Sequence, residues 1–362
     1  MIEDATPLTL EKHASLEFHS TEHVNGGPPL ASLGRSAVTS TDEFFVRNHG
    51  DVPELDPLMF SFGLDGLVAP ARLTLADLRR AFPRVTRPVT VQCAGNRRGD
   101  LSRLRPVPGE LPWESNAIST AVWGGVPLAA LLAAFPPAPA ARHAAFEGAD
   151  TVEREGRRFG FGGSIPLECV AELGVLLADE MNGEPLPPLH GGPLRVIVPG
   201  VIGARSVKWL RSINLQAEPS ANYFQRQAYR WYLPGDAAPE GAPMLHELAV
   251  NAVLCSPADR AVLPAGRAAL EGYAVAGGSA AVAGVEVSFD DGERWQAAEL
   301  DAPGRPGLWS HWRLSVDLRP GIYQCLVRAA DTHGRRQPRT GVWNAKGYLY
   351  NGWHSSTIVV LP

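Results

Sequence analysis

The stretch VTVQCAGNRRGD, residues 89–100, joins a short run of strand-forming residues to a loop rich in glycine and arginine. The β-branched residues Val89 to Val91 favour an extended strand, whereas glycine and asparagine tolerate the backbone angles of a tight turn. Cys93 is therefore expected at a strand end, where the neighbouring guanidinium groups of Arg97 and Arg98 would favour its thiolate form. This pattern suits a nucleophile or a soft-metal ligand, and an inert buried cysteine beside a solvated basic turn fits the same residues.

The length and charge of the chain limit the classes of function. With 362 residues, of which 45% are hydrophobic, the chain is long enough for two domains with separate cores. Its 33 basic and 38 acidic residues give a net charge of -5, so no general attraction to nucleic acid is expected. The sequence has no apolar run of about eighteen residues, and we therefore expect no membrane span.

Cysteine usage indicates a reducing compartment. The four cysteines, Cys93, Cys169, Cys255 and Cys325, are far apart and form no CxxC pair, which argues against a disulfide framework and against a thiolate zinc site. All except Cys93 lie in apolar or strand-like contexts and are expected in the core. The N-terminal residues include acidic side chains and no apolar core segment, so the interpretation is a cytoplasmic protein without a signal peptide.

The pattern of residues 41–235 predicts a mixed α+β domain, preceded by a polar arm at residues 1–40. Thr74 and Asp77 match a capping box, which marks the start of a helix. Helices are expected at 74–82 and 127–135, and strands at 175–178, 194–198 and 206–210.

Residues 240–362 predict a different architecture. A segment rich in proline and glycine at 233–243 marks the boundary, and helix signals nearly vanish beyond it. Asp290, Asp291 and Gly292 form a typical hairpin turn. Strands that largely alternate apolar and polar residues are expected at 268–276, 285–289, 309–318 and 322–329. This pattern predicts an all-β sandwich.

Several segments carry a resemblance that covers nearly the whole chain in the correct order. They are FFVRNH at 44–49, CAGNRR at 93–98, LPWESNAIST at 111–120, MNGEPLP at 181–187, HGGPLRVIVPGVIGARSVKWL at 190–210 and WNAKGYLYNGWH at 343–354. Together they resemble the sulfite oxidase family of mononuclear molybdopterin enzymes, in a haem-free form. The resemblance implies an α+β molybdopterin-binding domain followed by an immunoglobulin-like dimerisation domain, and hence a homodimer.

The resemblance also implies a molybdenum site. Cys93 would be the thiolate that ligates molybdenum beside the dithiolene sulfurs of molybdopterin, which agrees with the softness of both partners. The pterin carries a phosphate, so its pocket needs hydrogen-bond donors and positive charge. The residues that match cofactor-binding positions of the family are Phe45, Arg47, Asn48, His49, Asp150, His190, Arg195, Ser206 and Lys208.

The implied substrate is a small oxyanion. Arg47 and Arg98 match residues of the substrate pocket, and an arginine fork can hold two oxygens of sulfite at once. Trp113 matches a wall of that pocket, although a tryptophan at such a position is also typical of a core. The implied reaction oxidises sulfite to sulfate and passes the electrons to an external acceptor, either a cytochrome c-like protein or oxygen.

Two positions depart from the family pattern. Aligning residues 216–225 with the family places Ala221 where sulfite oxidases carry a tyrosine. Tyr223 would lie on the same side of an extended segment and is a candidate to restore the hydroxyl, with a packing role as the alternative. Lys346 stands where sulfite oxidases carry a further arginine, which keeps the charge and loses the bidentate geometry.

These departures leave other functions open. One is a molybdenum oxidoreductase for another oxyanion or oxide, in the manner of nitrate reductase. Another is a non-catalytic cofactor-binding protein. A cysteine hydrolase that uses Cys93 is disfavoured, because no motif places a histidine to act as its base.

Overall fold

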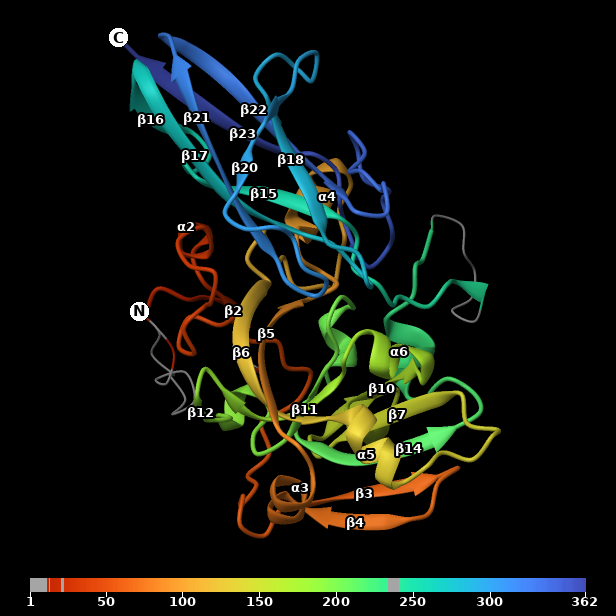
Figure 1. Ribbon diagram of the computed structural model, residues 1–362. Helices are drawn as coiled ribbons and strands as arrows, with labels where there is room; N and C mark the ends of the chain where they lie inside the picture. The colour runs from red at the N-terminus through yellow and green to blue at the C-terminus, as the bar shows by residue number, and fades with distance from the viewer. Residues whose placement is uncertain (1–11, 13, 21–22, 234–240) are drawn as a thin grey trace.

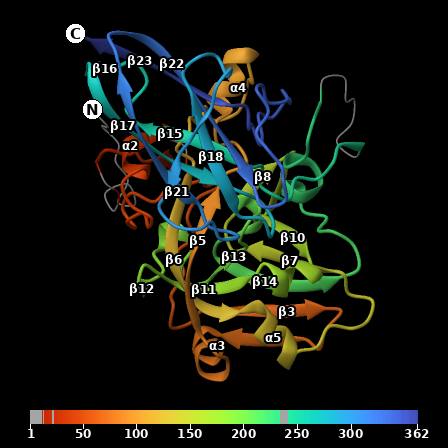
Figure 2. The ribbon, with the colours of Figure 1, turned by 45° about the horizontal axis from the view of Figure 1, so that its top comes forward.

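The computed structural model describes residues 12, 14–20, 23–233 and 241–362. The described chain forms two β-rich parts stacked along the long axis of the molecule, with the C-terminal strands at one end and the sheets of the N-terminal part at the other (Figure 1). The rotated view of Figure 2 shows the same stacking. No helix in the described ranges is long and apolar enough to cross a membrane.

The N-terminal part contains two five-stranded sheets. The first has the order β10 (Gly162–Pro166), β7 (His143–Gly148), β14 (Leu210–Gln216), β3 (Ser61–Gly66) and β4 (Ala71–Thr74), in which β14 runs parallel to β3. The second contains β12 (Glu184–Pro185), β11 (Leu176–Met181), β6 (Ile118–Pro127) and β5 (Val85–Gln92), with β13 (Arg195–Ile197) paired to β11.

Two helices cover the core between these sheets. The expected capping box is confirmed at α3 (Leu75–Ala81), where the Thr74 side chain accepts from the Asp77 amide and the Asp77 carboxylate accepts from the Thr74 amide. The alanine-rich helix is α5 (Leu128–Ala134), which begins directly after Pro127. Phe62, Leu78 and Ile213 are fully buried in the resulting core, and each contributes about 1.5–3 kcal/mol by burial.

The remaining elements of the N-terminal part are short. They are β1 (Glu17–Ser20), β2 (Asn25–Gly27), α2 (Leu30–Leu33), α4 (Arg98–Leu104), β8 (Val152–Arg154), β9 (Arg157–Phe159), α6 (Glu168–Glu172), the 3₁₀ turns η1 (Pro188–His190) and η2 (Gly203–Arg205), and the π-helical turn η3 (Phe224–Ala228).

The prediction of a strand at 206–210 is wrong for residues 206–209. The chain leaves η2 through an irregular segment, and β14 begins only at Leu210. The Ser206 hydroxyl accepts a hydrogen bond from the Val198 amide, 3.0 Å away, and Trp209 adopts a left-handed backbone with φ 51°. These local contacts replace strand pairing and direct Lys208 toward a pocket described below.

The C-terminal part confirms the expected all-β sandwich. One sheet contains β15 (Asn251–Ser256), β17 (Gly266–Val275), β21 (Ser310–Leu318) and β20 (Glu299–Leu300). The other contains β16 (Ala261–Pro264), β23 (His354–Leu361), β22 (Gly321–Asp331), β18 (Val282–Ser288) and β19 (Gln296–Ala297). Alternate side chains from both sheets, such as Leu270, Val287 and Ile358, are fully buried between them.

Candidate active site

Cys93 follows the last residue of β5, so the expected strand-end position is observed. Its amide donates to the Ala117 carbonyl at 2.9 Å, and the Gly95 amide lies 3.4 Å from its sulfur. The residue is 7% exposed and packs with Phe45 and Val91 in one apolar cluster. The sulfur is therefore held at the wall of a pocket rather than on the surface.

The structure brings together every residue that the sequence assigned to the cofactor. Together with Cys93, the pocket is lined by Phe45, Arg47, Asn48, His49, Asp150, His190, Arg195, Ser206 and Lys208. These residues come from the loop before β3, the turn after β7, η1, β13 and the irregular segment before β14. Segments far apart in the sequence thus converge on one hollow beside the thiol.

The pocket contains the buried cations Arg195 and Lys208, which form no ion pair with a carboxylate of the described residues. Arg195 donates to the carbonyl oxygens of His190 and Ser206, at 2.7 and 2.9 Å, and burial lowers its pKa to about 9. Lys208 donates to the Asn48 side-chain oxygen and to the Leu189 carbonyl. Burial, followed by the charge of Arg195, lowers the pKa of Lys208 well below its usual value. Because buried charge is costly when it is not compensated, this pocket favours an anionic ligand.

Two buried histidines add neutral polar groups. Burial lowers the pKa of both His49 and His190 well below 6.5, with nearby cations contributing. The Nε2 atom of His190 lies 2.7 Å from the Lys12 Nζ atom. Sequence reasoning missed Lys12, and the polar arm gave no signal for it. The buried Asn48 Nδ2 donor has no hydrogen-bond partner among the described residues, so it is available to a ligand.

Arg98 and Lys346 lie together next to this pocket rather than in its lining. The Arg98 side chain donates from Nε to the Lys346 carbonyl at 2.9 Å and from Nη1 to the Leu111 carbonyl at 2.7 Å. Its guanidinium carbon lies 5.3 Å from the centre of the Tyr348 ring. A Cβ atom at Gly95 would lie 2.6 Å from the Arg98 guanidinium, so glycine is required there for this placement.

Trp113 lies behind Cys93 in the same apolar cluster and does not line the pocket. The ring is fully buried, 6.4 Å from Phe45 and 4.7 Å from His19 between ring centroids. Its Nε1 donor has no partner among the described residues. The structure therefore does not support the expectation that Trp113 forms a wall of the substrate pocket, and its burial is typical of a core tryptophan.

The structure favours the packing alternative for Tyr223 over the role of restoring a hydroxyl to the pocket. Ala221 is exposed, and Tyr223 lines a separate surface hollow and packs against Phe159. The argument from an extended segment failed because the chain enters the π-helical turn η3 directly after Tyr223. A tyrosyl hydroxyl is nevertheless present in the pocket, and it belongs to Tyr229.

Tyr229 connects the pocket to the group around Arg98. Its hydroxyl lies 2.8 Å from the His49 Nε2 atom, and its ring stacks on Tyr348 with centroids 5.2 Å apart. Burial raises the pKa of Tyr229, so the phenol stays protonated. Sequence reasoning missed this residue, and the available signal was the aromatic-rich stretch YRWY at 229–232.

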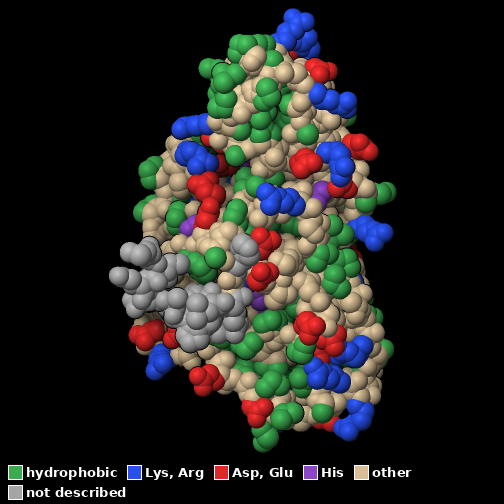
Figure 3. Space-filling model, turned by 90° about the vertical axis from the view of Figure 1, so that its left-hand side faces the viewer, with side chains coloured by type: hydrophobic (Ala, Val, Ile, Leu, Met, Phe, Trp, Pro, Cys, Tyr) green, Lys and Arg blue, Asp and Glu red, His purple; other side chains and the backbone are tan. Residues whose placement is uncertain are grey.

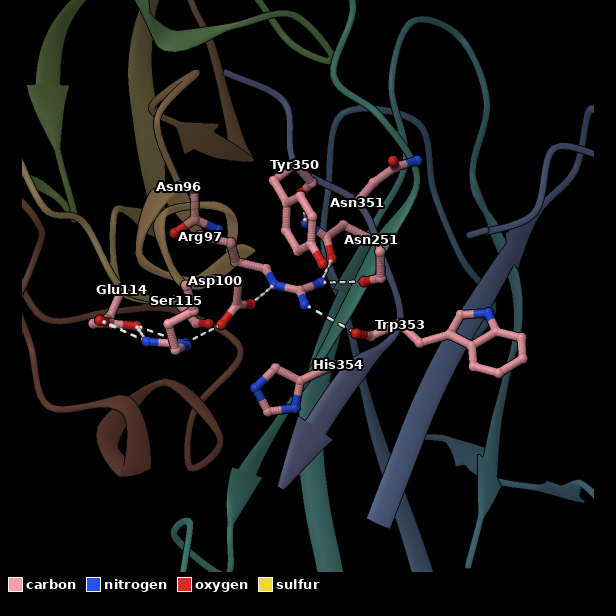
Figure 4. Close-up of polar contacts among 12 residues, drawn as sticks. Asn96, Arg97, Asp100, Glu114, Ser115, Asn251, Tyr350, Asn351, Trp353 and His354 are labelled. Atoms are coloured by element: carbon pink, nitrogen blue, oxygen red, sulfur yellow. Dashed lines mark hydrogen bonds and ion pairs between the residues drawn. The ribbon is translucent and has the colours of Figure 1, made fainter. Parts of the chain in front are cut away.

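Arg97 connects the cysteine loop to the C-terminal sandwich (Figure 4). It donates to the Asp100 carboxylate at 2.6 Å, to Asn251 Oδ1 at 2.7 Å and to the Gly352 carbonyl at 2.8 Å. Its backbone is left-handed, with φ 65°, and its side chain is 1% exposed. The two neighbouring arginines therefore have different roles, since Arg97 joins the two parts of the chain and Arg98 lies beside the pocket.

Each of the two parts of the chain matches a known protein family model. Residues 49–224 match the oxidoreductase molybdopterin binding domain, and residues 242–360 match the Mo-co oxidoreductase dimerisation domain. Sulfite oxidase from Arabidopsis thaliana is 36% identical over 95% of this chain and 93% of its own length. The chain belongs to the sulfite oxidase family. Mitochondrial sulfite oxidase from Macaca fascicularis, another member, is 38% identical over 97% of this chain and 67% of its own length.

The wider comparisons agree with this family. The crystal structure of the sulfane dehydrogenase SoxCD from Paracoccus pantotrophus matches with a TM-score of 0.81 and 25% identity, over 98% of this chain and 91% of that chain. A nitrate reductase from Hordeum vulgare is 35% identical over 95% of this chain, and the match spans 42% of that protein. The protein is thus a molybdopterin-dependent oxidoreductase with a sulfite oxidase-type fold.

The residues present fit the Mo-molybdopterin cofactor of the family. The described residues include no cluster of three or more His, Cys, Asp or Glu side chains that would hold a metal alone. Cys93 instead offers one soft ligand, which suits a metal whose other ligands come from a dithiolene. Lys208, Arg195 and the unpaired Asn48 amide form a cationic, donor-rich region that suits the phosphate of the pterin.

Proposed function

We propose that this protein oxidises sulfite to sulfate at a molybdenum cofactor ligated by Cys93. The observation that carries the proposal is the position of Cys93 in a pocket with buried cations, directly beside the further cations Arg98 and Lys346. One positive region suits the phosphate of the cofactor, and the other suits a small oxyanion. When bound, the cofactor supplies oxygen-atom transfer and accepts two electrons.

The side chains of the chain would bind and orient the substrate. Arg47, Arg98 and Lys346 provide positive charge for the oxygens of sulfite. Tyr229 remains a protonated phenol in the lining of the pocket, so its hydroxyl can donate a hydrogen bond toward a substrate oxygen. Its partner His49 is kept neutral by burial, so the Tyr229 hydroxyl has a hydrogen-bond partner without a competing positive charge.

The electrons would pass to an external acceptor, either a cytochrome c-like protein or oxygen, and the active form would be a homodimer in the cytoplasm. The dimer is supported by the match of residues 242–360 to a dimerisation domain. The sandwich also exposes an apolar row in which Val262 and Ile322 flank Val359 on neighbouring strands. Val262 is 60% exposed and Ile322 is 77% exposed, so this row is available to a second copy.

Sulfite turnover tests the proposed function directly. Protein of measured molybdenum content is mixed with sulfite, and the reduction of cytochrome c or ferricyanide and the consumption of oxygen are followed. Sulfite-dependent activity in at least one assay is the expected result. A molybdenum-loaded protein that is inert in all three assays would overturn the proposal.

A second function is tested with the same sample. Reduction of another oxyanion, such as nitrate, is favoured by Lys346 at a position where sulfite oxidases carry arginine. Nitrate-dependent oxidation of a reduced viologen dye measures it. Nitrate turnover faster than sulfite turnover would establish the alternative, and absence of molybdenum would instead favour a non-catalytic role.

A further inference from the structure

The carboxylate of Glu110 lies between the two cations that flank the pocket. Its Oε1 atom lies 3.0 Å from the Lys346 Nζ atom, and its Oε2 atom lies 3.6 Å from the Arg98 Nη2 atom. The two oxygens of one side chain therefore face two different cations. This is the arrangement that an oxyanion substrate would adopt between them.

The surroundings of Glu110 make this contact more than a surface ion pair. The side chains of Glu110 and Arg98 are 17% and 4% exposed, so solvent screens their interaction only partly. Burial raises the pKa of Tyr348 well above its usual value, and the nearby Tyr229 and Glu110 raise it further. The Glu110 charge therefore acts on the same aromatic pair that connects the pocket to Arg98.

The cations have few other charged partners. Arg98 otherwise donates to the carbonyl oxygens of Lys346 and Leu111, and its guanidinium faces the Tyr348 ring. Lys346 has Glu110 as its ion-pair partner, with its own side chain 42% exposed. The Glu110 carboxylate thus balances part of the positive charge of Arg98 and Lys346, the two cations that are expected to bind the substrate.

We propose that Glu110 is a specificity-determining residue that acts as an internal competitor for the oxyanion site. An anion must draw Arg98 and Lys346 away from this carboxylate before it can bind both of them. Binding is therefore weaker than the two cations alone would give, and only an anion that offers both of them better contacts displaces Glu110. The inference rests on the proposed function only for the identity of the physiological anion.

Removal of Glu110 is expected to change the anion affinity in opposite directions for a competing role and for a structural role. If Glu110 merely held the two cations in position, its removal would weaken anion binding. If Glu110 competes with the anion, removal of its charge strengthens binding, because Arg98 and Lys346 are then free to pair with the ligand. Replacement is expected to be structurally mild, since Glu110 lies in an irregular loop and its side chain is not fully buried.

The test uses the molybdenum-loaded protein and sulfate as the probe, with binding measured by calorimetry at low ionic strength. Glu110→Gln and Glu110→Ala are compared with wild type, so that one poorly folding variant does not decide the outcome. Glu114→Gln is the matched control, because Glu114 lies on the same loop and pairs with the exposed Arg103 at 3.2 Å. The Glu110 variants are expected to bind sulfate about tenfold more tightly, and the control to match wild type.

Each result is decisive. Unchanged or weaker sulfate binding in folded Glu110 variants would overturn the inference, as would an equal gain in Glu114→Gln. A gain confined to Glu110 variants supports it, even if the loaded wild type fails to oxidise sulfite, in which case only the proposed function fails. In an active enzyme, the Glu110 variants are also expected to lower the KM for sulfite without raising kcat.

Discussion

The guanidinium of Arg97 lies 2.7 Å from Asn251 Oδ1, across the boundary between the cysteine loop and the C-terminal sandwich. Figure 4 shows Arg97 reaching from the loop toward Asn251 and Trp353, with Asp100 beside it. The loop that carries Cys93 is thereby attached to the matched dimerisation domain. The position of Cys93 thus depends on contacts made outside its own part of the chain.

Replacing Arg97 tests this attachment. Arg97→Met leaves the Asp100 carboxylate and the polar groups around Asn251 without their buried partner, and we expect the free energy of unfolding to fall by about 3 kcal/mol. Urea unfolding measures the change. The control is Arg103→Met, because Arg103 also pairs with Asp100 and its side chain is 62% exposed. Equal stability of the two variants would contradict the attachment.

The two tyrosines give a paired test of the site geometry. Tyr229→Phe removes a hydroxyl that lies in the pocket, so kcat is expected to fall about a hundredfold with little loss of folding stability. Tyr223→Phe removes a hydroxyl from a separate surface hollow, and its turnover should match wild type. Steady-state kinetics with sulfite provide the comparison. A larger loss in Tyr223→Phe would show that the hydroxyl of that residue reaches the substrate instead.

Acid is expected to destabilise the protein through His354. Burial, with the charge of Arg97, lowers the pKa of His354 from 6.5 to about 4. The unfolded chain therefore binds the proton first as the pH falls, so the stability contribution is complete above pH 6.5 and is lost toward pH 4. The loss amounts to about 3 kcal/mol. Urea unfolding measures the free energy of unfolding at pH 7.5 and at pH 4.5. This free energy should decrease less between the two pH values for His354→Gln than for wild type, and equal decreases would refute the assignment.

The apolar row on the sandwich is expected to be part of the dimer contact. Figure 3 shows hydrophobic side chains gathered over the sandwich end of the molecule. Ile322→Glu places a charge beside Val359 in this row and should convert the dimer to a monomer in light scattering at micromolar concentration. Leu58→Glu, at a position 91% exposed in the N-terminal part, is the control and should remain dimeric. A monomeric wild type would refute the dimer itself.

Much of the site was predictable, the strand-end cysteine from residue type and the cofactor-binding residues from the family resemblance. Cys93 was expected at a strand end and is found there, and the cofactor-binding candidates from Phe45 to Lys208 line one pocket. All of these residues except Asp150 lie in segments that carry the family resemblance.

Other parts depend on backbone geometry that the pattern does not reveal. The π-helical turn at 224–228 separates Tyr223, which lies outside the pocket, from Tyr229, which lines it. Local hydrogen bonds replace most of the strand expected at 206–210. Glu110 and Lys12 were missed because a single charged residue in a polar segment carries no periodic signal. Their roles depend on partners far away in the sequence.

The most direct test of the account measures molybdenum content and sulfite turnover on the same samples of wild type and Cys93→Ser. Wild type is expected to contain near-stoichiometric molybdenum and to oxidise sulfite. Cys93→Ser is expected to fold and to retain the pterin, because the phosphate-binding residues are unchanged, and to lose turnover. Full sulfite oxidation by Cys93→Ser would contradict the assignment of Cys93 as the metal ligand.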